Sequence, residues 1–182
     1  MIPLGMVHGR FQPFHNGHLA YLLAAASRCE RLLVGITNPD PARTRAEAED
    51  PRRHLREANL FTYTERLLMV EAAAREAGVP VPVHVIPFPI NEPELWPAYV
   101  PPGTVHFLRV FSPWGRVKLD RLRRGGYEAV LLDEGAAKDV SGEQVRHALR
   151  SGGDWERLVP AAVARVIHSL PAERARDLGL AP

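Results

Sequence analysis

The sequence predicts an α/β protein with a mostly parallel, five-stranded sheet and helices on both faces. Short apolar runs alternate with helical patterns along the chain, and parallel strands need crossover connections of that kind. With 182 residues, of which 46% are hydrophobic, the chain is long enough for one domain with a substantial core. We therefore expect a single domain over residues 1–182, with a C-terminal helical part over about 154–182 whose tail, from about residue 171, is loosely held.

The strands and helices follow from the hydrophobic pattern in chain order. Strands are expected at five apolar runs, over about residues 2–8, 31–37, 83–88, 104–111 and 127–133. Helices are expected over about 17–28 and 62–77, and others lie between and after the later strands. The helix over 62–77 starts with Thr62 and Glu65 at capping-box spacing, which marks its beginning.

A long polar segment separates the second expected strand from the helix over 62–77. It carries six basic side chains: Arg43, Arg45, Arg52, Arg53, His54 and Arg56. Acidic residues are interleaved with them, so the segment is either a solvated, self-paired loop or a surface that binds phosphate or carboxylate through bidentate arginine contacts. Its length is unusual for a plain connection and favours a functional segment.

The composition excludes several classes of protein. The chain has 23 basic residues, all arginine except Lys118 and Lys138, and a net charge of only +2. No run of about 18 apolar residues and no signal-peptide layout is present, so a cytoplasmic protein with no membrane partner is expected. Cys29 is the single cysteine, which excludes an intrachain disulfide framework and a cysteine-based zinc site.

Residues 9–18, GRFQPFHNGH, connect the first expected strand to the first expected helix. In a parallel sheet this turn lies at the carboxyl ends of the strands, where phosphates commonly bind. Gly9 allows close backbone approach, and Gly17 suits the entry to a helix whose free N–H groups attract anions. His15 and His18 are three residues apart, so both can donate hydrogen bonds to phosphate oxygens. The segment therefore predicts a polyphosphate site.

The two histidines do not form a recognisable metal motif. A zinc site would need a third ligand and a spacing such as HxxxH, which is not the spacing here. Neither GxxxxGK[ST] nor GxGxxG follows the first strand. We expect no metal site built from protein ligands; Mg²⁺, held mainly by phosphates and water, is the expected cofactor and arrives with a nucleoside triphosphate.

A second informative stretch, DVSGEQVRHAL, covers residues 139–149. Ser141 and Gln144 form a capping box at the start of an amphipathic helix. A plain capped helix does not explain Arg146 in its second turn. If this helix begins near the first site, Arg146 and the free amides around Gly142 form the opposite wall of a phosphate clamp.

These motifs resemble those of a known family. GRFQPFHNGH resembles the GxFxPxHxGH signature of the nucleotidyltransferase superfamily, and SGEQVR resembles its companion ISGTxVR motif. NLFTYTERLLMV resembles the NPFTxGER segment of archaeal-type nicotinamide mononucleotide adenylyltransferases, and NEPELWPAYV with VFSPWGRVKLDRLRRGGYEAV resembles their acceptor-site region. The resemblance spans roughly residues 4–150 and implies a Rossmann-like nucleotidyltransferase fold, in agreement with the pattern of strands and helices.

The resemblance also implies roles for individual residues. His15, His18 and Arg146 would be the catalytic side chains on the phosphates. The nucleotide would be bound further by residues of the two motifs: Gly9, Arg10, Phe11, Gln12, Phe14, Gly17, Ser141 and Gly142. An acceptor oxyanion would attack the α-phosphorus in line and pyrophosphate would leave, with no protein nucleophile.

The acceptor is indicated by departures from the adenylyltransferase pattern. The family's short segment of the kind GSAQxSHT is replaced here by NPDPARTRAEAEDPRRHLREA, whose arginines suit a compact, multiply anionic acceptor. That resembles a branch of cytidylyltransferases acting on phosphonates. Trp96 is retained and would suit a pyridinium ring through stacking, although a buried packing role is equally compatible with it. The candidate acceptor-binding residues are Arg43, Arg52, Arg53, His54 and Trp96.

Three functions remain in order of preference. The first is nucleotidyl transfer, with CTP slightly favoured, to a phosphate or phosphonate oxygen of a small acidic acceptor. The second is ATP-dependent adenylylation of nicotinamide mononucleotide in NAD synthesis. The third is a non-catalytic binder of nucleotides or nucleic acid, which the sequence pI of about 9.0 permits. The basic residues gather in one loop without interleaved aromatic residues, which is unlike a nucleic-acid-binding surface. The base, the acceptor and any homo-oligomerisation are left open by the sequence.

Overall fold

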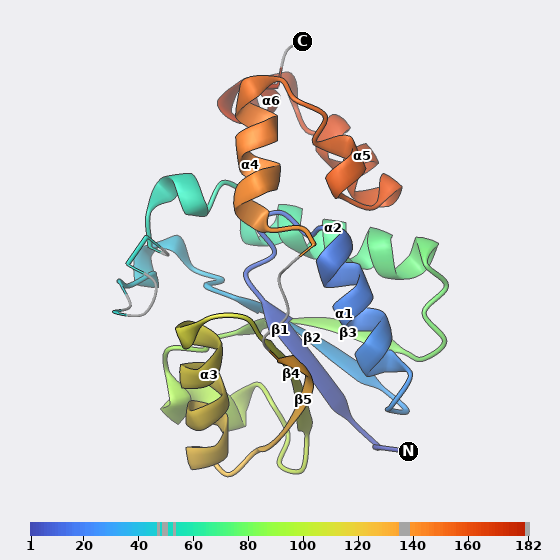
Figure 1. Ribbon diagram of the computed structural model, residues 1–182, viewed down its shortest axis with the longest axis vertical. Helices are drawn as coiled ribbons and strands as arrows, with labels where there is room; N and C mark the ends of the chain where they lie inside the picture. The colour runs from blue at the N-terminus through green and yellow to red at the C-terminus, as the bar shows by residue number, and fades with distance from the viewer. Residues whose placement is uncertain (47, 49–50, 53, 135–138, 181–182) are drawn as a thin grey trace.

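A parallel sheet of five strands forms the centre of the molecule (Figure 1). The computed structural model describes residues 1–46, 48, 51–52, 54–134 and 139–180. The strands are β1 (Gly5–Gly9), β2 (Leu32–Thr37), β3 (Val83–Phe88), β4 (Val105–Val110) and β5 (Glu128–Glu134). Their order across the sheet is β3-β2-β1-β4-β5, and every neighbouring pair is parallel. The five strands expected from the sequence are confirmed, each to within a few residues.

Helices cover both faces of this sheet. They are α1 (Asn16–Ala26), α2 (Tyr63–Glu76), α3 (Pro113–Arg124), α4 (Gly142–Ser151), α5 (Ala161–His168) and α6 (Ala172–Asp177). The helices α1 and α2 pack on one face, and α3 packs on β4 and β5 from the other (Figure 1). The predicted Rossmann-like α/β fold is confirmed. No described helix has the length and apolar character that a membrane span requires.

Successive residues of β1 face opposite layers of the core, because side chains alternate along a strand. Val7 joins the cluster formed with α1, α2 and α5, whereas Met6 joins the cluster formed with α3. Both residues are at most 1% exposed, as expected for a central strand of a parallel sheet covered on both faces. The rigid strand therefore fixes the position of the loop that follows it.

The expectation of a loosely held tail is wrong for residues 171–178. Leu178 is 1% exposed and belongs to the core cluster that α1 and α2 share. Arg174 of α6 forms an ion pair with Glu65 of α2, with Nε 2.6 Å from Oε1. The C-terminal helix is thus packed against the element that supports the functional loop.

Candidate active site

A cavity of about 220 Å³ opens at the carboxyl ends of β1 and β4. β1 pairs with β2 along its whole length, from Gly5 to Gly9, but with β4 at Gly5 and Met6. The two strands therefore separate toward their carboxyl ends, at the point in the sheet where the strand order reverses. Open parallel sheets bind ligands in that crevice.

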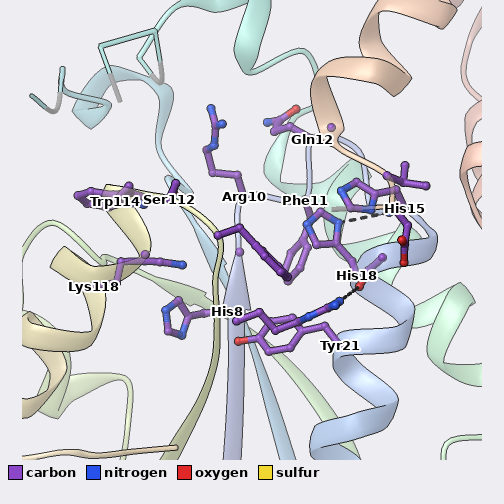
Figure 2. Close-up of a pocket in the computed structure, with 18 of the residues that line it drawn as sticks. His8, Arg10, Phe11, Gln12, His15, His18, Tyr21, Ser112, Trp114 and Lys118 are labelled. Carbon is purple, nitrogen blue, oxygen red and sulfur yellow. Dashed lines mark hydrogen bonds between the residues drawn. The ribbon is translucent and has the colours of Figure 1, made fainter. Parts of the chain in front are cut away.

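The loop between β1 and α1 forms one side of the cavity (Figure 2). The lining residues from this loop and the adjoining turn of α1 are Gly9, Arg10, Phe11, Gln12, His15, Gly17 and His18. The Gln12 side chain ties the loop to Phe61: its Nε2 donates to the Phe61 carbonyl at 2.8 Å, and its Oε1 accepts from the Phe61 amide at 2.7 Å. Gln12 thus has a positioning role in addition to lining the site.

The backbone at Phe11 is strained. Its φ of +52° lies in the left-handed region, which an aromatic residue rarely adopts. The ring is buried, 5.3 Å from that of Phe14 and 4.9 Å from that of His18. A side chain added at Gly9 would meet the Phe11 ring at 2.8 Å, so the tight fold of the loop requires glycine there. Strained residues of this kind persist where the surroundings fix them, and they gather at binding sites.

A buried arginine of α2 holds the loop from behind. The Nη1 atom of Arg66 donates to the carbonyl oxygens of Arg10 at 2.9 Å and Thr37 at 2.8 Å, and its Nη2 donates to that of Asn38 at 2.9 Å. Burial lowers the pKa of Arg66 to about 10, so the guanidinium remains charged near neutral pH. The Arg66 side chain thus joins the ends of β1 and β2. No role was predicted for Arg66 from the sequence, although it lies in the TYTER stretch that resembles a family motif.

Glu65, the neighbour of Arg66, links α2 to the C-terminal helix. Its carboxylate accepts hydrogen bonds from the Thr62 amide at 2.8 Å and from Arg174 at 2.6 and 3.0 Å. Burial alone would raise the pKa of Glu65, but these hydrogen bonds outweigh it and the pKa is lowered. The predicted Thr62–Glu65 capping box is confirmed, and its glutamate also anchors α6.

His15 and His18 form a stacked pair at the start of α1. Their ring centroids are 3.6 Å apart and their planes differ by 22°. The His15 amide donates to Nδ1 of His18 at 3.3 Å (Figure 2). Because Nδ1 accepts that bond, the proton of a neutral His18 ring is on Nε2, which is then a donor suited to a phosphate oxygen.

Arg146 of α4 closes the same side of the cavity. It is 8% exposed, lines the cavity and donates from Nη1 to the Gln12 carbonyl at 2.7 Å. The first residue of α4 is Gly142, where an added side chain would lie 3.1 Å from that carbonyl. Ser141 caps the helix by accepting from the Gln144 amide at 3.2 Å, which confirms the predicted capping box. The beginning of α4 and the GRFQPFHNGH loop therefore meet, as the phosphate-clamp interpretation requires.

The opposite side of the cavity comes from β4, α3 and the end of β1. Its lining residues are His8, Arg109, Phe111, Ser112, Trp114, Gly115 and Lys118. Arg109 is paired with Asp133 at 2.9 Å and lies over the Phe111 ring at 4.9 Å. None of these residues was predicted individually as a site residue, but VFSPWGRVK, which contains five of them, is part of the stretch that resembles the acceptor-site region of the adenylyltransferases.

Several predicted residues lie away from this cavity. Trp96 is 1% exposed, packs 5.6 Å from Phe88 and donates its indole N–H to the Pro89 carbonyl at 2.9 Å. The expected stacking of Trp96 on an acceptor ring is therefore corrected to a packing role in the core beneath α3. Phe14 is fully buried, does not line the cavity and packs with its ring 5.3 Å from that of Phe11.

The basic loop is also placed elsewhere. Arg43 forms an ion pair with Glu92 beside a separate cavity of about 230 Å³. Arg52 and His54 are exposed, and neither is among the residues that line the cavity between β1 and β4. Arg53 lies outside the described residues. The structure thus does not bring the described members of this loop to the candidate site.

A metal ion at this site would rely on its substrate for ligands. Among the described residues that line the cavity, Asp139 carries the one carboxylate. No described cluster of three or more histidine, cysteine or acidic side chains could hold an ion. One carboxylate together with phosphate oxygens and water matches the way Mg²⁺ is commonly bound, so the donor set fits a nucleotide-borne Mg²⁺.

A tight loop with a histidine pair and a buried arginine, at the switch point of a parallel sheet, is the arrangement typical of nucleotide-binding α/β proteins. Residues 6–82 match the family model described as cytidylyltransferase-like. The chain is 49% identical over 164 residues to phosphonoformate cytidylyltransferase of Streptomyces viridochromogenes, covering 90% of this chain and 89% of that one. It is 34% identical over 172 residues to nicotinamide-nucleotide adenylyltransferase of Picrophilus torridus, covering 93% and 94%.

The fold has a solved counterpart in the bifunctional NMN adenylyltransferase/ADP ribose pyrophosphatase of Francisella tularensis. The TM-score is 0.71 at 14% identity, over 98% of this chain and 53% of that chain. The chain thus spans about half of that protein, and the likeness concerns the fold. This chain belongs to the cytidylyltransferase-like family of nucleotidyltransferases, and it is an enzyme of that class.

Proposed function

We propose that the enzyme transfers a cytidylyl group from CTP to the phosphonate oxygen of a small acidic acceptor and releases pyrophosphate. The main support for this proposal is the 49% identity, over about nine-tenths of both chains, to a phosphonoformate cytidylyltransferase. The site supports it because Trp96, the residue that favoured a pyridine ring, is buried in the core. Cationic groups face the cavity from both of its sides, which suits two anionic substrates.

The proposed reaction needs no covalent enzyme intermediate. A phosphonate oxygen attacks the α-phosphorus of CTP, a new phosphorus–oxygen bond forms, and the bond to the β-phosphate breaks as pyrophosphate leaves. The phosphonate is already ionised near neutral pH, so the enzyme's work is to position two anions and to stabilise growing negative charge. Cys29, buried at the far end of the sheet beside Ile2, has no part in this step.

The site residues divide this work between them. His18 and His15 are proposed to donate to oxygens of the transferring and leaving phosphates, and Arg146 to bind the triphosphate from the α4 side. Arg10 is proposed as a further cation on the phosphates, with its carbonyl fixed by Arg66. Mg²⁺ bound with the nucleotide supplies neutralisation of phosphate charge, with Asp139 the candidate protein ligand.

A pyrophosphate-release screen tests this proposal. ATP, CTP, GTP and UTP are each paired with phosphonoformate, hydroxymethylphosphonate and nicotinamide mononucleotide, with and without Mg²⁺. The proposal predicts the highest turnover for CTP with a phosphonate. The adenylyltransferase alternative, which the 34% identity to the Picrophilus enzyme favours, predicts the highest turnover for ATP with nicotinamide mononucleotide.

A further inference from the structure

The side of the cavity formed by α3 differs from the nucleotide side in its chemistry. Lys118 and Trp114 are one helical turn apart on α3, so they face the same way, and both line the cavity. Figure 2 shows Lys118 extending from α3 toward β1, with Arg10 and Phe11 between it and the pair His15 and His18. An ammonium group therefore lies across the cavity from the phosphate-binding loop.

The reaction requires an acceptor on that side. In-line displacement places the attacking oxygen and the leaving pyrophosphate on opposite faces of the α-phosphorus. His15, His18 and Arg146 occupy the α1 and α4 side, where the triphosphate is proposed to bind. The acceptor then approaches from the α3 side, and its second anionic group meets the residues there.

Lys118 is the suitable cation on that side. Arg109, the other cationic side chain there, is a guanidinium that lies over the Phe111 ring at 4.9 Å. Lys118 is half-buried, and its ammonium is a compact charge with three rotatable donors on a flexible stem, which can reach a small carboxylate in a narrow space. The chain otherwise uses arginine for nearly all of its 23 basic positions, yet lysine stands here.

We infer that Lys118 determines acceptor specificity by binding the carboxylate of a phosphonocarboxylate acceptor, with His8 beside it at the end of β1. The inference rests on the proposed function and deepens it, because it names the acceptor class as phosphonates with a second negative charge one carbon from phosphorus. It assigns to Lys118 the role that the sequence gave to the basic loop.

The test compares two acceptors that differ in that charge. Phosphonoformate carries a carboxylate, whereas hydroxymethylphosphonate has a neutral hydroxyl in its place. With CTP saturating, Lys118→Met is expected to raise the KM for phosphonoformate about tenfold or more, as loss of a charged hydrogen bond does. The KM for hydroxymethylphosphonate and the KM for CTP should stay within about twofold. Arg124→Met, at an exposed position of the same helix, is the matched control and should resemble the unmodified enzyme.

Each outcome decides one claim. Equal changes for both acceptors, or none for either, contradict the role of Lys118 while turnover by the unmodified enzyme upholds the proposed function. A rise in the phosphonoformate KM in an Arg52→Ala/His54→Ala variant, without one in Lys118→Met, returns acceptor recognition to the basic loop. Failure of the unmodified enzyme to use phosphonoformate with any nucleotide contradicts both the proposed function and this inference. Thermal melting of each variant shows whether folding is retained.

Discussion

The stacked rings of His15 and His18 are the residue-scale feature on which the proposed binding of anions depends. A separation of 3.6 Å between ring centroids would bring two positive charges together if both rings were protonated, and a polyphosphate between them and Arg146 would offset that repulsion. The hydrogen bond from the backbone amide of His15 to Nδ1 of His18 fixes the orientation of the His18 ring. We therefore expect the proposed binding of a triphosphate to require little rearrangement of the His18 ring.

We expect His18→Ala to lower kcat by about 100-fold or more, because a preorganised donor to transition-state charge commonly contributes that much. Steady-state pyrophosphate release measures it. His147→Ala, at an exposed histidine of α4, is the control and should leave kcat unchanged. Near-normal kcat in a well-folded His18→Ala protein would remove His18 from the proposed chemistry.

Buried His106 makes a prediction about acid stability. Its ring is fully buried on β4, 5.1 Å from the Tyr127 ring and 5.7 Å from the His8 ring, and burial lowers its pKa to about 4. In the unfolded chain the His106 ring is protonated below about pH 6.5, whereas in the folded chain it is protonated only below about pH 4. The contribution of neutral His106 to the free energy of unfolding is therefore fully present above pH 6.5 and is lost as the pH falls from 6.5 to 4. Between pH 7.5 and pH 5 the loss from His106 is about 2 kcal/mol.

Urea unfolding at pH 7.5 and pH 5 measures this loss in the free energy of unfolding. In the His106→Leu variant, the difference in that free energy between the two pH values should be smaller by most of about 2 kcal/mol. Leucine fills a similar apolar volume and does not titrate. An identical pH dependence in the variant and the unmodified protein would mean that His106 is protonated in the folded state, or that other groups account for the acid sensitivity.

At the scale of elements, the C-terminal helix is connected to the loop between β1 and α1 through a series of contacts. Arg174 of α6 forms an ion pair with Glu65, whose carboxylate accepts a hydrogen bond from the amide of Thr62, the N-cap of α2. The backbone of the preceding residue, Phe61, forms two hydrogen bonds with the Gln12 side chain. The Gln12 carbonyl in turn accepts from Arg146. Four segments that are distant in sequence are thus joined at one loop.

We expect Arg174→Ala to lower the free energy of unfolding by about 1–3 kcal/mol, since it leaves the largely buried Glu65 carboxylate without its cation. The KM for CTP should rise as the loop loses support, with less effect on the acceptor. Denaturant unfolding and steady-state kinetics measure the two effects. Arg176→Ala, an exposed change on α6, is the control, and equal stability of the two variants would contradict the supporting role.

At the scale of the whole molecule, the sequence predicts the repeating pattern better than the long-range contacts. The strand at 83–88 is found with the predicted bounds because it is a short, mostly apolar run between turn residues, although it lies at the edge of the sheet and is only half-buried. The meeting of the β1–α1 loop with α4 was predicted from two motifs at strand ends, and the contact of Arg146 with Gln12 realises it.

What the sequence missed depends on which segments share a face. The stretch VFSPWGRVK resembles a known acceptor-site region, but which of its residues line the cavity depends on β4 lying next to β1, because strand order is not encoded in local periodicity. Trp96 was ambiguous for the same reason, since a tryptophan packs or stacks according to its tertiary surroundings. Arg174 lies in a short, charged segment whose composition resembles a frayed end, and only its partner Glu65 explains its place.

The most direct test of the central claim is phosphorus NMR of the product formed from CTP and phosphonoformate. We expect a pair of mutually coupled phosphorus signals from a new phosphonate–phosphate anhydride, which appears together with pyrophosphate in equal amounts and forms more slowly, by about 100-fold or more, with the His18→Ala variant. Hydrolysis of CTP without a coupled pair, or a coupled pair only when ATP and nicotinamide mononucleotide are supplied, would contradict the central claim.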